Sequence, residues 1–211
     1  MYGGVGNFIL LSKKKYIGPL YTRPDKYDKI DSKGNILKKR DTFRFQQKIY
    51  QGIVDLILWK KDPSTEIKNY ITLEIDNLLN GKVELDDLIY TKNFRGDYKN
   101  PENNIQQVIV DKIKKRNPIE APKGNERINY CFIKVVGAKL EAHRVEDPNY
   151  VKKYNIPIDY HHYIEKISNP VCDLLVDTID NPKKIFYKYK DLNYKRKHPE
   201  EDPRQKKFCW S

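Results

Sequence analysis

The spacing of the apolar residues changes near residue 42, and this change constrains the fold more than any other feature. Beyond it, Phe45, Ile49 and Ile53 recur at helical spacing, which predicts a helix over 42–60. Before it, short β-prone runs alternate with turn signals, at 8–11, 16–21, Pro24-Asp25 and 33–35. The sequence therefore predicts an α+β protein in which a small antiparallel β-meander precedes a mainly helical part.

The helical part carries its own start and stop signals. Asp41 or Thr42 is expected to cap the first helix, and Ser64 or Thr65 a second one that ends at Gly81. Asn103 or Asn104 should cap a third helix. The remaining expectations are strands at 88–94 and 127–136, a short helix from Asp147-Pro148 to Tyr154, and a helix over 159–179 that breaks near Asn169-Pro170.

Charge is unevenly distributed along the chain. The 41 basic residues exceed the 29 acidic ones by 12. Residues 1–61 carry a net charge of +9, residues 62–182 carry −3, and residues 183–211 carry +6. Basic ends interleaved with Tyr and Phe suggest a polyanion as partner, most often a nucleic acid. A generic solvated basic surface is the alternative.

Composition also excludes several classes of protein. No run approaches the roughly 20 apolar residues of a membrane span, so no membrane partner is expected. Cys131, Cys172 and Cys209 are too few and too scattered for a disulfide framework, and they show no zinc-like spacing. An intracellular, reducing location fits best.

Three stretches together resemble the C-terminal part of a family B DNA polymerase of the delta type or the large DNA virus type. These are FILLSKKKYIG at 8–18 with KKRD at 38–41, PIEAPKGNERINYCFIKV at 118–135, and EDPNYVKKYNIPIDYHHYIE at 146–165. The resemblance implies a distal palm fragment with the KKKYIG motif over 1–41 and a thumb domain over 42–182. The basic segment 183–211 lies outside it and is expected to be a flexible tail.

The motifs that would make such a chain catalytic are not present in it. Family B enzymes hold two metal ions with carboxylates in motifs like DxxSLYPS and YGDTDS, and neither occurs here. We therefore expect no catalytic residue, no metal ligand and no cofactor in this chain, with Mg²⁺ bound only in a complete polymerase. Although it resembles a nucleotidyltransferase family, the chain alone is expected to be inactive.

The resemblance implies that the remaining residues contact duplex DNA. Lys14, Lys15 and Tyr16 would lie along the minor groove, whose hydrogen-bond acceptors are nearly the same for every base pair. Lys39 or Arg40 would contact the phosphate of the primer strand, or Arg40 would form an ion pair with Asp41 or Asp31. The candidate DNA-binding residues are Lys13, Lys14, Lys15, Tyr16, Lys39, Arg40, Lys92, Arg95, Tyr98 and Arg127.

The implied function is DNA replication, in which the chain holds primer–template duplex as a fragment or split subunit. A second chain carrying the catalytic palm would then be a partner, in the nucleus or at a viral replication site. The alternative is a stand-alone DNA-binding module or gene relic without a catalytic partner. An RNA-binding protein is a remoter reading, because no RNP or KH signature is present.

Two other groups of residues have an ordinary structural explanation. The cations at the end of the third helix, Lys112 to Arg116, would complement the helix dipole. His161 and His162 have no metal-like spacing and are expected to pack or to lie on the surface.

Overall fold

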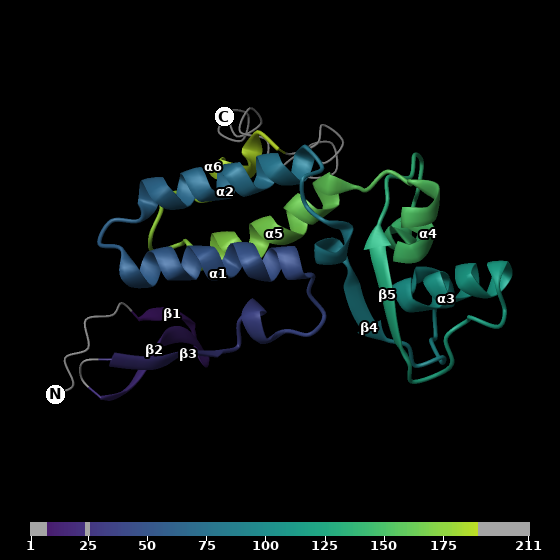
Figure 1. The fold of residues 1–211 in the computed structure, drawn as a ribbon, viewed down its shortest axis with the longest axis horizontal. Helices are drawn as coiled ribbons and strands as arrows, with labels where there is room; N and C mark the ends of the chain where they lie inside the picture. Colours follow the sequence, from purple (N-terminus) through teal and green to yellow (C-terminus); the bar gives the residue numbers. More distant parts are fainter. Residues whose placement is uncertain (1–7, 24–25, 190–211) are drawn as a thin grey trace, which may run out of the picture.

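A small sheet, a layer of helices and a second small sheet make up the computed structural model, which describes residues 8–23 and 26–189 (Figure 1). This confirms the α+β class. The predicted turn at Pro24-Asp25, Cys209 and residues 190–211 of the expected tail lie outside the described residues. Residues 183–189 of that tail are described, and Phe186 and Tyr189 are buried. The main elements are β1 Ile9–Ser12, β2 Lys15–Arg23, β3 Lys26–Lys33, α1 Arg44–Trp59, α2 Ser64–Leu79, β4 Tyr90–Asn93, α3 Ile105–Arg116, β5 Arg127–Phe132, β6 Val145–Glu146, α4 Pro148–Tyr154, α5 Tyr160–Leu174 and α6 Lys184–Tyr187.

The first sheet is an antiparallel meander in the order β1-β2-β3. Ser12 pairs with Lys15, so Lys13 and Lys14 form the turn between β1 and β2. Lys14 adopts a positive φ of 68°. These two side chains do not alternate between the faces of the sheet, because side chains in a tight turn do not follow the two-residue period of a strand.

The start of α1 is fixed by packing, and the predicted capping residues are wrong. Phe43 is fully buried, with its ring centroid 5.0 Å from those of Tyr90 and Tyr163, and its side chain makes no capping hydrogen bond. The side-chain amide of Gln47 donates a hydrogen bond to the Thr42 hydroxyl at 2.9 Å. The burial of Phe43 in the core therefore determines where α1 begins.

The other helix ends agree with the sequence in part. Pro63 stands at the N-cap of α2 with no side-chain capping bond, so the prediction of Ser64 or Thr65 is wrong. Gly81 follows the C-terminus of α2 at a φ of +69°, as expected. The side chain of Asn104 accepts a backbone N–H bond and caps α3, which confirms that prediction. Helix α4 begins at Pro148 as expected, and the Asp147 side chain caps it by accepting from the Asn149 amide.

Helix α5 runs without interruption through Pro170 and ends at Leu174, which contradicts the predicted break. Proline has no amide hydrogen, so the carbonyl of Lys166 loses its partner within the helix. The buried Gln46 side chain of α1 donates to this carbonyl at 2.6 Å. A side chain from a neighbouring helix thus satisfies the group that the proline leaves free.

The second sheet has the order β4-β5-β6, and β5 is its central strand. Tyr90 pairs with Tyr130, and Asn93 pairs with Arg127. Strand β5 ends at Phe132, four residues earlier than predicted, and Val136 is 95% exposed. Ile133 makes only an isolated bridge to Ile158, so the apolar run continues beyond the regular strand.

Tyr163 of α5 ties this sheet to the helices. Its hydroxyl accepts a hydrogen bond from the Phe132 amide and donates one to the Leu88 carbonyl, both at 2.9 Å. The residue is fully buried. Tyr163→Phe is expected to lower the free energy of unfolding by about 1–3 kcal/mol, because it leaves two buried backbone groups without partners. Urea denaturation measures the loss, and faster exchange of the Phe132 amide would localise it.

Glu146 holds α3 against the end of the same sheet. Its side chain is 5% exposed and accepts two hydrogen bonds from Arg116, at 2.9 and 2.7 Å. The Lys112 ammonium lies 3.6 Å away. Burial opposes ionisation of Glu146, yet the Arg116 hydrogen bonds, the Asp147 amide and Lys112 hold its pKa below its ordinary value.

Candidate nucleic-acid interface

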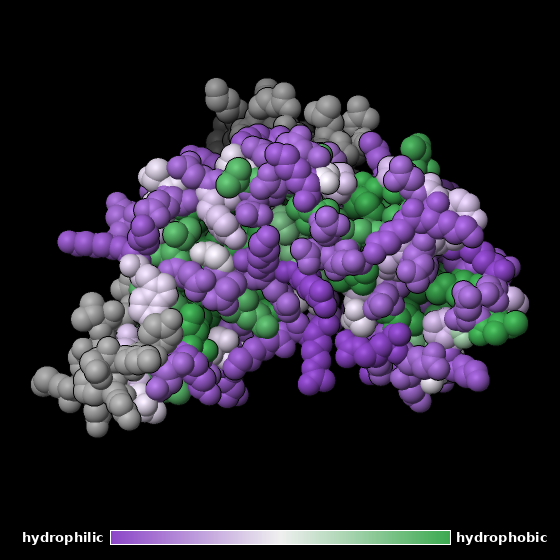
Figure 2. Space-filling view, viewed as in Figure 1, coloured by the Kyte–Doolittle hydropathy of each residue, from purple (hydrophilic) through white to green (hydrophobic). Residues whose placement is uncertain are grey.

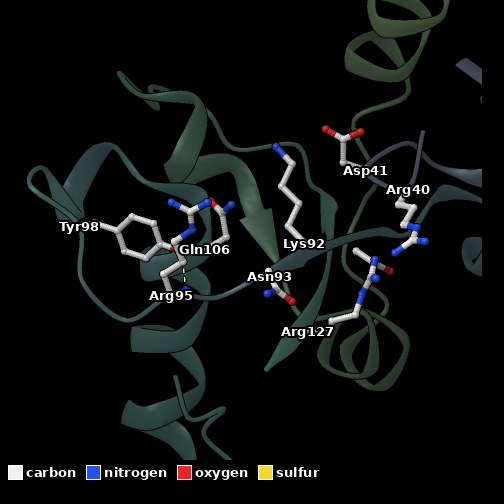
Figure 3. Close-up of a pocket in the computed structure, with 9 residues that line it drawn as sticks. Arg40, Asp41, Lys92, Asn93, Arg95, Tyr98, Gln106 and Arg127 are labelled. Atoms are coloured by element: carbon white, nitrogen blue, oxygen red, sulfur yellow. Dashed lines mark hydrogen bonds between the residues drawn. The ribbon is translucent and has the colours of Figure 1, made fainter. Parts of the chain in front are cut away.

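A hollow of about 560 Å³ gathers basic side chains from separate parts of the chain (Figure 3). Arg95 and Tyr98 lie at one end of it, and Arg40 and Arg127 at the other. The segment before α1, strand β4 and its following loop, α3 and β5 all contribute. The lining residues are Arg40, Asp41, Thr91, Lys92, Asn93, Arg95, Tyr98, Gln106 and Arg127.

The loop after β4 is held in place by several short hydrogen bonds. The amide of Arg95 donates to the Tyr98 hydroxyl at 2.9 Å. The Phe94 amide donates to the carbonyl of Glu126 at 2.8 Å, and its carbonyl accepts from Asn125 at 2.6 Å. These bonds fix the loop against the segment that leads into β5, so Arg95 and Arg127 are carried by one connected unit.

The hollow is strongly cationic. Four of its lining residues are basic and one, Asp41, is a carboxylate. Within residues 8–23 and 26–189, none of the four basic side chains forms an ion pair. The alternative pairing of Arg40 with Asp31 or Asp41 is therefore not found; Lys38 pairs with Asp31 instead, at 3.7 Å. Cations without local counter-charges favour a bound anion.

The structure divides the ten candidate residues into three groups. Arg40, Lys92, Arg95, Tyr98 and Arg127 share the hollow described above. Lys15 and Lys39 line a second hollow of about 570 Å³, between the first sheet, the middle of α1 and the C-terminal end of α5. The remaining three, Lys13, Lys14 and Tyr16, line neither. Figure 2 shows hydrophilic side chains on both sides of the indentation between the two sheets.

Tyr16 is engaged within its own sheet. Its hydroxyl donates to the Asp31 carboxylate at 2.8 Å, and its ring stacks on Phe8 with centroids 5.7 Å apart. The hydrogen bond to Asp31 raises the pKa of Tyr16, and in return it lowers the pKa of Asp31. Another molecule could therefore contact Tyr16 only through the parts of its ring that Phe8 does not cover.

The two groups of residues given a structural explanation in the sequence have structural roles here. Lys112 and Arg116 bind the buried Glu146. His162 is buried and stacks on Phe132 at a centroid distance of 3.5 Å. Burial lowers the pKa of His162 to about 2, so its ring is neutral at physiological pH.

Four residues of the hollow are absent from the candidates that the sequence identified. The sequence marks Asp41 only as a cap and as an ion-pair partner, and Thr91, Asn93 and Gln106 are uncharged. Asn93 pairs with Arg127 across the two strands, and Gln106 lies in the first turn of α3. Their place in the hollow depends on strand register and helix packing, for which single residues give no signal.

The sequence of this chain matches a known protein family. The family model described as DNA polymerase family B matches residues 5–178. This chain therefore belongs to the family B DNA polymerases.

The relatives are much longer than this chain. The DNA polymerase of Pyramimonas orientalis virus is 36% identical over 172 residues, which are 80% of this chain and 14% of that protein. The DNA polymerase of Acanthamoeba polyphaga mimivirus is 37% identical, over 86% of this chain and 11% of that protein. The DNA polymerase delta catalytic subunit of Plasmodium falciparum is 31% identical, over 85% of this chain and 16% of that protein.

A solved structure has the same fold. The family B DNA polymerase from Pyrobaculum calidifontis superposes with a TM-score of 0.62 at 21% identity, over 82% of this chain and 21% of that chain.

The described part of the chain has neither a metal-ligand cluster nor a membrane-spanning helix. No group of three or more His, Cys, Asp or Glu side chains there could hold a metal ion. None of its helices is long and apolar enough to cross a membrane. Cys131 and Cys172 are not joined in a disulfide.

Proposed function

We propose that this chain holds primer–template duplex DNA during DNA replication, as part of a family B DNA polymerase. The observation that carries the proposal is the hollow in which Arg40, Lys92, Arg95 and Arg127 converge without ion-pair partners in the described residues. Basic side chains that contact phosphates fix the position of a duplex without reading its sequence. A replicative enzyme requires such tolerance because it must move along any template.

The turn lysines extend the proposed contact surface. Lys13, Lys14 and Lys15 are all exposed, and they project from the tip of the first sheet. Lys39 is exposed on the segment that joins this sheet to α1. Tyr16 belongs to the same surface through its ring, because its hydroxyl is already donated to Asp31.

Catalysis in this proposal depends on residues outside these 211. The described residues do not fit a two-metal site, and the sequence lacks the carboxylate motifs of the family. The metal-binding palm, with its Mg²⁺, would come from a partner polypeptide or from a further segment. The nucleus or a viral replication site would be the place of action.

Fluorescence anisotropy with labelled primer–template DNA tests the proposal. The affinity should be the same for two duplexes of unrelated sequence and should fall steeply with salt. Four phosphate contacts alone give a slope of log K against log salt of about −3.6, and eight give about −7. If heparin at matched charge concentration competes as well as duplex DNA does, the binding is generic and the proposal is wrong.

The alternative of a stand-alone DNA-binding module or gene relic makes the same binding prediction and differs in activity. A primer-extension assay distinguishes the two. On the proposal made here, nucleotides are incorporated only when the catalytic part of a polymerase is added. A module without a catalytic partner would bind duplex and leave incorporation unchanged.

A further inference from the structure

The loop that carries Arg95 is closed by a single side chain. It follows β4 at the hollow, and Gly96 adopts a φ of +83° within it. The Arg95 amide donates to the Tyr98 hydroxyl at 2.9 Å. In the part of the chain that the structure describes, the Arg95 backbone makes no other hydrogen bond. The Tyr98 hydroxyl is therefore the group that holds the Arg95 backbone in place.

The ring of Tyr98 gives this hydroxyl a fixed position. It packs against the main hydrophobic core, and its centroid lies 6.0 Å from that of Phe94, which is 6% exposed. The backbone of Phe94 is bonded in turn to the segment before β5, through the Glu126 carbonyl and the Asn125 amide. A tyrosine side chain has only two rotatable bonds that place its ring, so packing of the ring also fixes the hydroxyl. The Arg95 amide thus meets a rigid acceptor.

The other side of the loop is bounded by the segment before β5. A Cβ added to Gly124 would stand 3.5 Å from the Arg95 carbonyl oxygen, and one added to Gly96 would stand 3.8 Å from the Gly124 Cα. These are contact distances, so the two segments touch at their glycines. The Arg95 backbone is thereby enclosed between Gly124 and the Tyr98 hydroxyl.

The Arg95 side chain, in contrast, is exposed and has no support of its own. It forms neither an ion pair nor a hydrogen bond within residues 8–23 and 26–189. Figure 3 shows it at the same end of the hollow as the Tyr98 ring. The direction in which the guanidinium projects therefore depends on the Arg95 backbone, and that backbone depends on Tyr98.

We propose that Tyr98 is a positioning residue of the interface: its hydroxyl holds the loop so that the Arg95 guanidinium meets a backbone phosphate of the duplex. Tyr98 then contributes to binding through Arg95 and makes no contact of its own with the phosphate. This inference rests on the proposed function and assigns a role within the same hollow.

A direct contact between the Tyr98 hydroxyl and a phosphate is the alternative. The two roles differ in the salt dependence that they produce. A cation at a phosphate releases about 0.9 counterions, whereas a neutral hydroxyl releases none. The slope of log K against log salt therefore distinguishes a loss that acts through Arg95 from a loss at Tyr98 itself.

Tyr98→Phe in the full chain tests the inference, with labelled primer–template duplex titrated by anisotropy over a series of salt concentrations. Arg95→Gln should weaken binding about 5-fold at low salt and reduce the steepness of the slope by about 0.9. Tyr98→Phe should produce at least about half of both changes, although it removes no charge. In the Arg95→Gln background, Tyr98→Phe should change neither quantity, because the two residues act as one unit.

Amide exchange gives an independent measurement on the loop. The Arg95 amide should exchange faster in Tyr98→Phe, whereas the Phe94 amide, which is bonded to Glu126, should keep its protection. Unchanged exchange of Arg95 or unchanged duplex binding by Tyr98→Phe would overturn the inference. So would weaker binding with no change in slope, or an equal loss with and without the Arg95 guanidinium.

Tyr189→Phe is the matched control. The Tyr189 hydroxyl donates to the Asp76 carboxylate of α2 at 2.8 Å, and Tyr189 lines neither hollow, so the same substitution removes a hydrogen bond elsewhere in the fold. Its duplex affinity and its slope should equal those of the wild type. If its slope changes as much as that of Tyr98→Phe, the effect comes from the fold at large and the inference is wrong.

The same titrations separate this inference from the proposed function. If the wild-type chain binds duplex DNA with the expected salt dependence and Tyr98→Phe leaves the slope unchanged, only the positioning role is wrong. If the wild-type chain does not bind duplex DNA specifically, the proposed function is wrong before any variant is compared.

Discussion

Replacing Arg40, Arg95 and Arg127 together with glutamine is expected to weaken binding to primer–template duplex by roughly two orders of magnitude at low salt. All three side chains are exposed in the hollow and have no ion-pair partner in the described residues, so their removal should not disturb folding. Each lost phosphate contact lowers the slope of log K against log salt by about 0.9, or about 2.7 for the three. Anisotropy titrations from low to moderate salt measure both quantities.

A second triple variant removes the same charge elsewhere. Lys61, Lys68 and Lys184 are exposed, and Lys68 and Lys184 lie on α2 and α6, which are on the side of the helical layer away from the first sheet (Figure 1). Replacing them with glutamine should change the slope of log K against log salt by much less than 2.7, because these lysines would act on the DNA only through long-range electrostatics, which salt screens. Equal losses from the two triples would show that net charge, and not the hollow, governs binding.

Glu146→Gln is expected to lower the free energy of unfolding by about 2–3 kcal/mol at neutral pH. Breaking a buried ion pair costs about 3–5 kcal/mol, and the estimate is reduced here because solvent reaches the Arg116 and Lys112 side chains, which are 33% and 29% exposed. Denaturation by guanidinium chloride measures the loss. Glu66→Gln, which breaks the exposed pair with Lys60, is the control and should cost less than about 1 kcal/mol.

The effect of Glu146→Gln should also depend on pH in a defined direction. The folded-state pKa of Glu146 lies below its ordinary value of 4.5. Its ionised form therefore stabilises the fold above pH 4.5, and that contribution is lost as the pH falls through the folded pKa. The difference between wild type and variant should be full at pH 7 and smaller at pH 3. A difference that does not change with pH would show that the carboxylate charge is not its source.

The elements that could be predicted are those whose signal is local. The β-meander, helices α1 to α4 and the cap Asn104 follow from apolar spacing and capping chemistry over a few residues. Two of the failures depend on contacts between residues that are distant in the sequence. Phe43 begins α1 because Tyr90 and Tyr163 surround it, and α5 continues through a proline because of a residue on another helix.

The candidate site also divides into features that the sequence predicts and features that it does not. The sequence identified individual basic residues, because their types and the family resemblance mark them. It did not show that Lys39 and Arg40, which are adjacent, line different hollows, or that Asn93 and Gln106 lie beside the arginines. Grouping of this kind depends on strand register and on the packing of α3, and neither is encoded by a short stretch of sequence.

The hydrogen bond from Gln46 to the Lys166 carbonyl links two positions that a substitution could not change independently. A chain with an ordinary residue at position 170 would regain the amide hydrogen, and that hydrogen would compete for the carbonyl inside α5. The Gln46 amide would then be buried without a partner, at a cost of about 1–3 kcal/mol. Mutation at either site alone is therefore disfavoured, and a compensating change at the other would be needed. Residues 46 and 170 should evolve as a pair, although nothing in the local sequence around either one refers to the other.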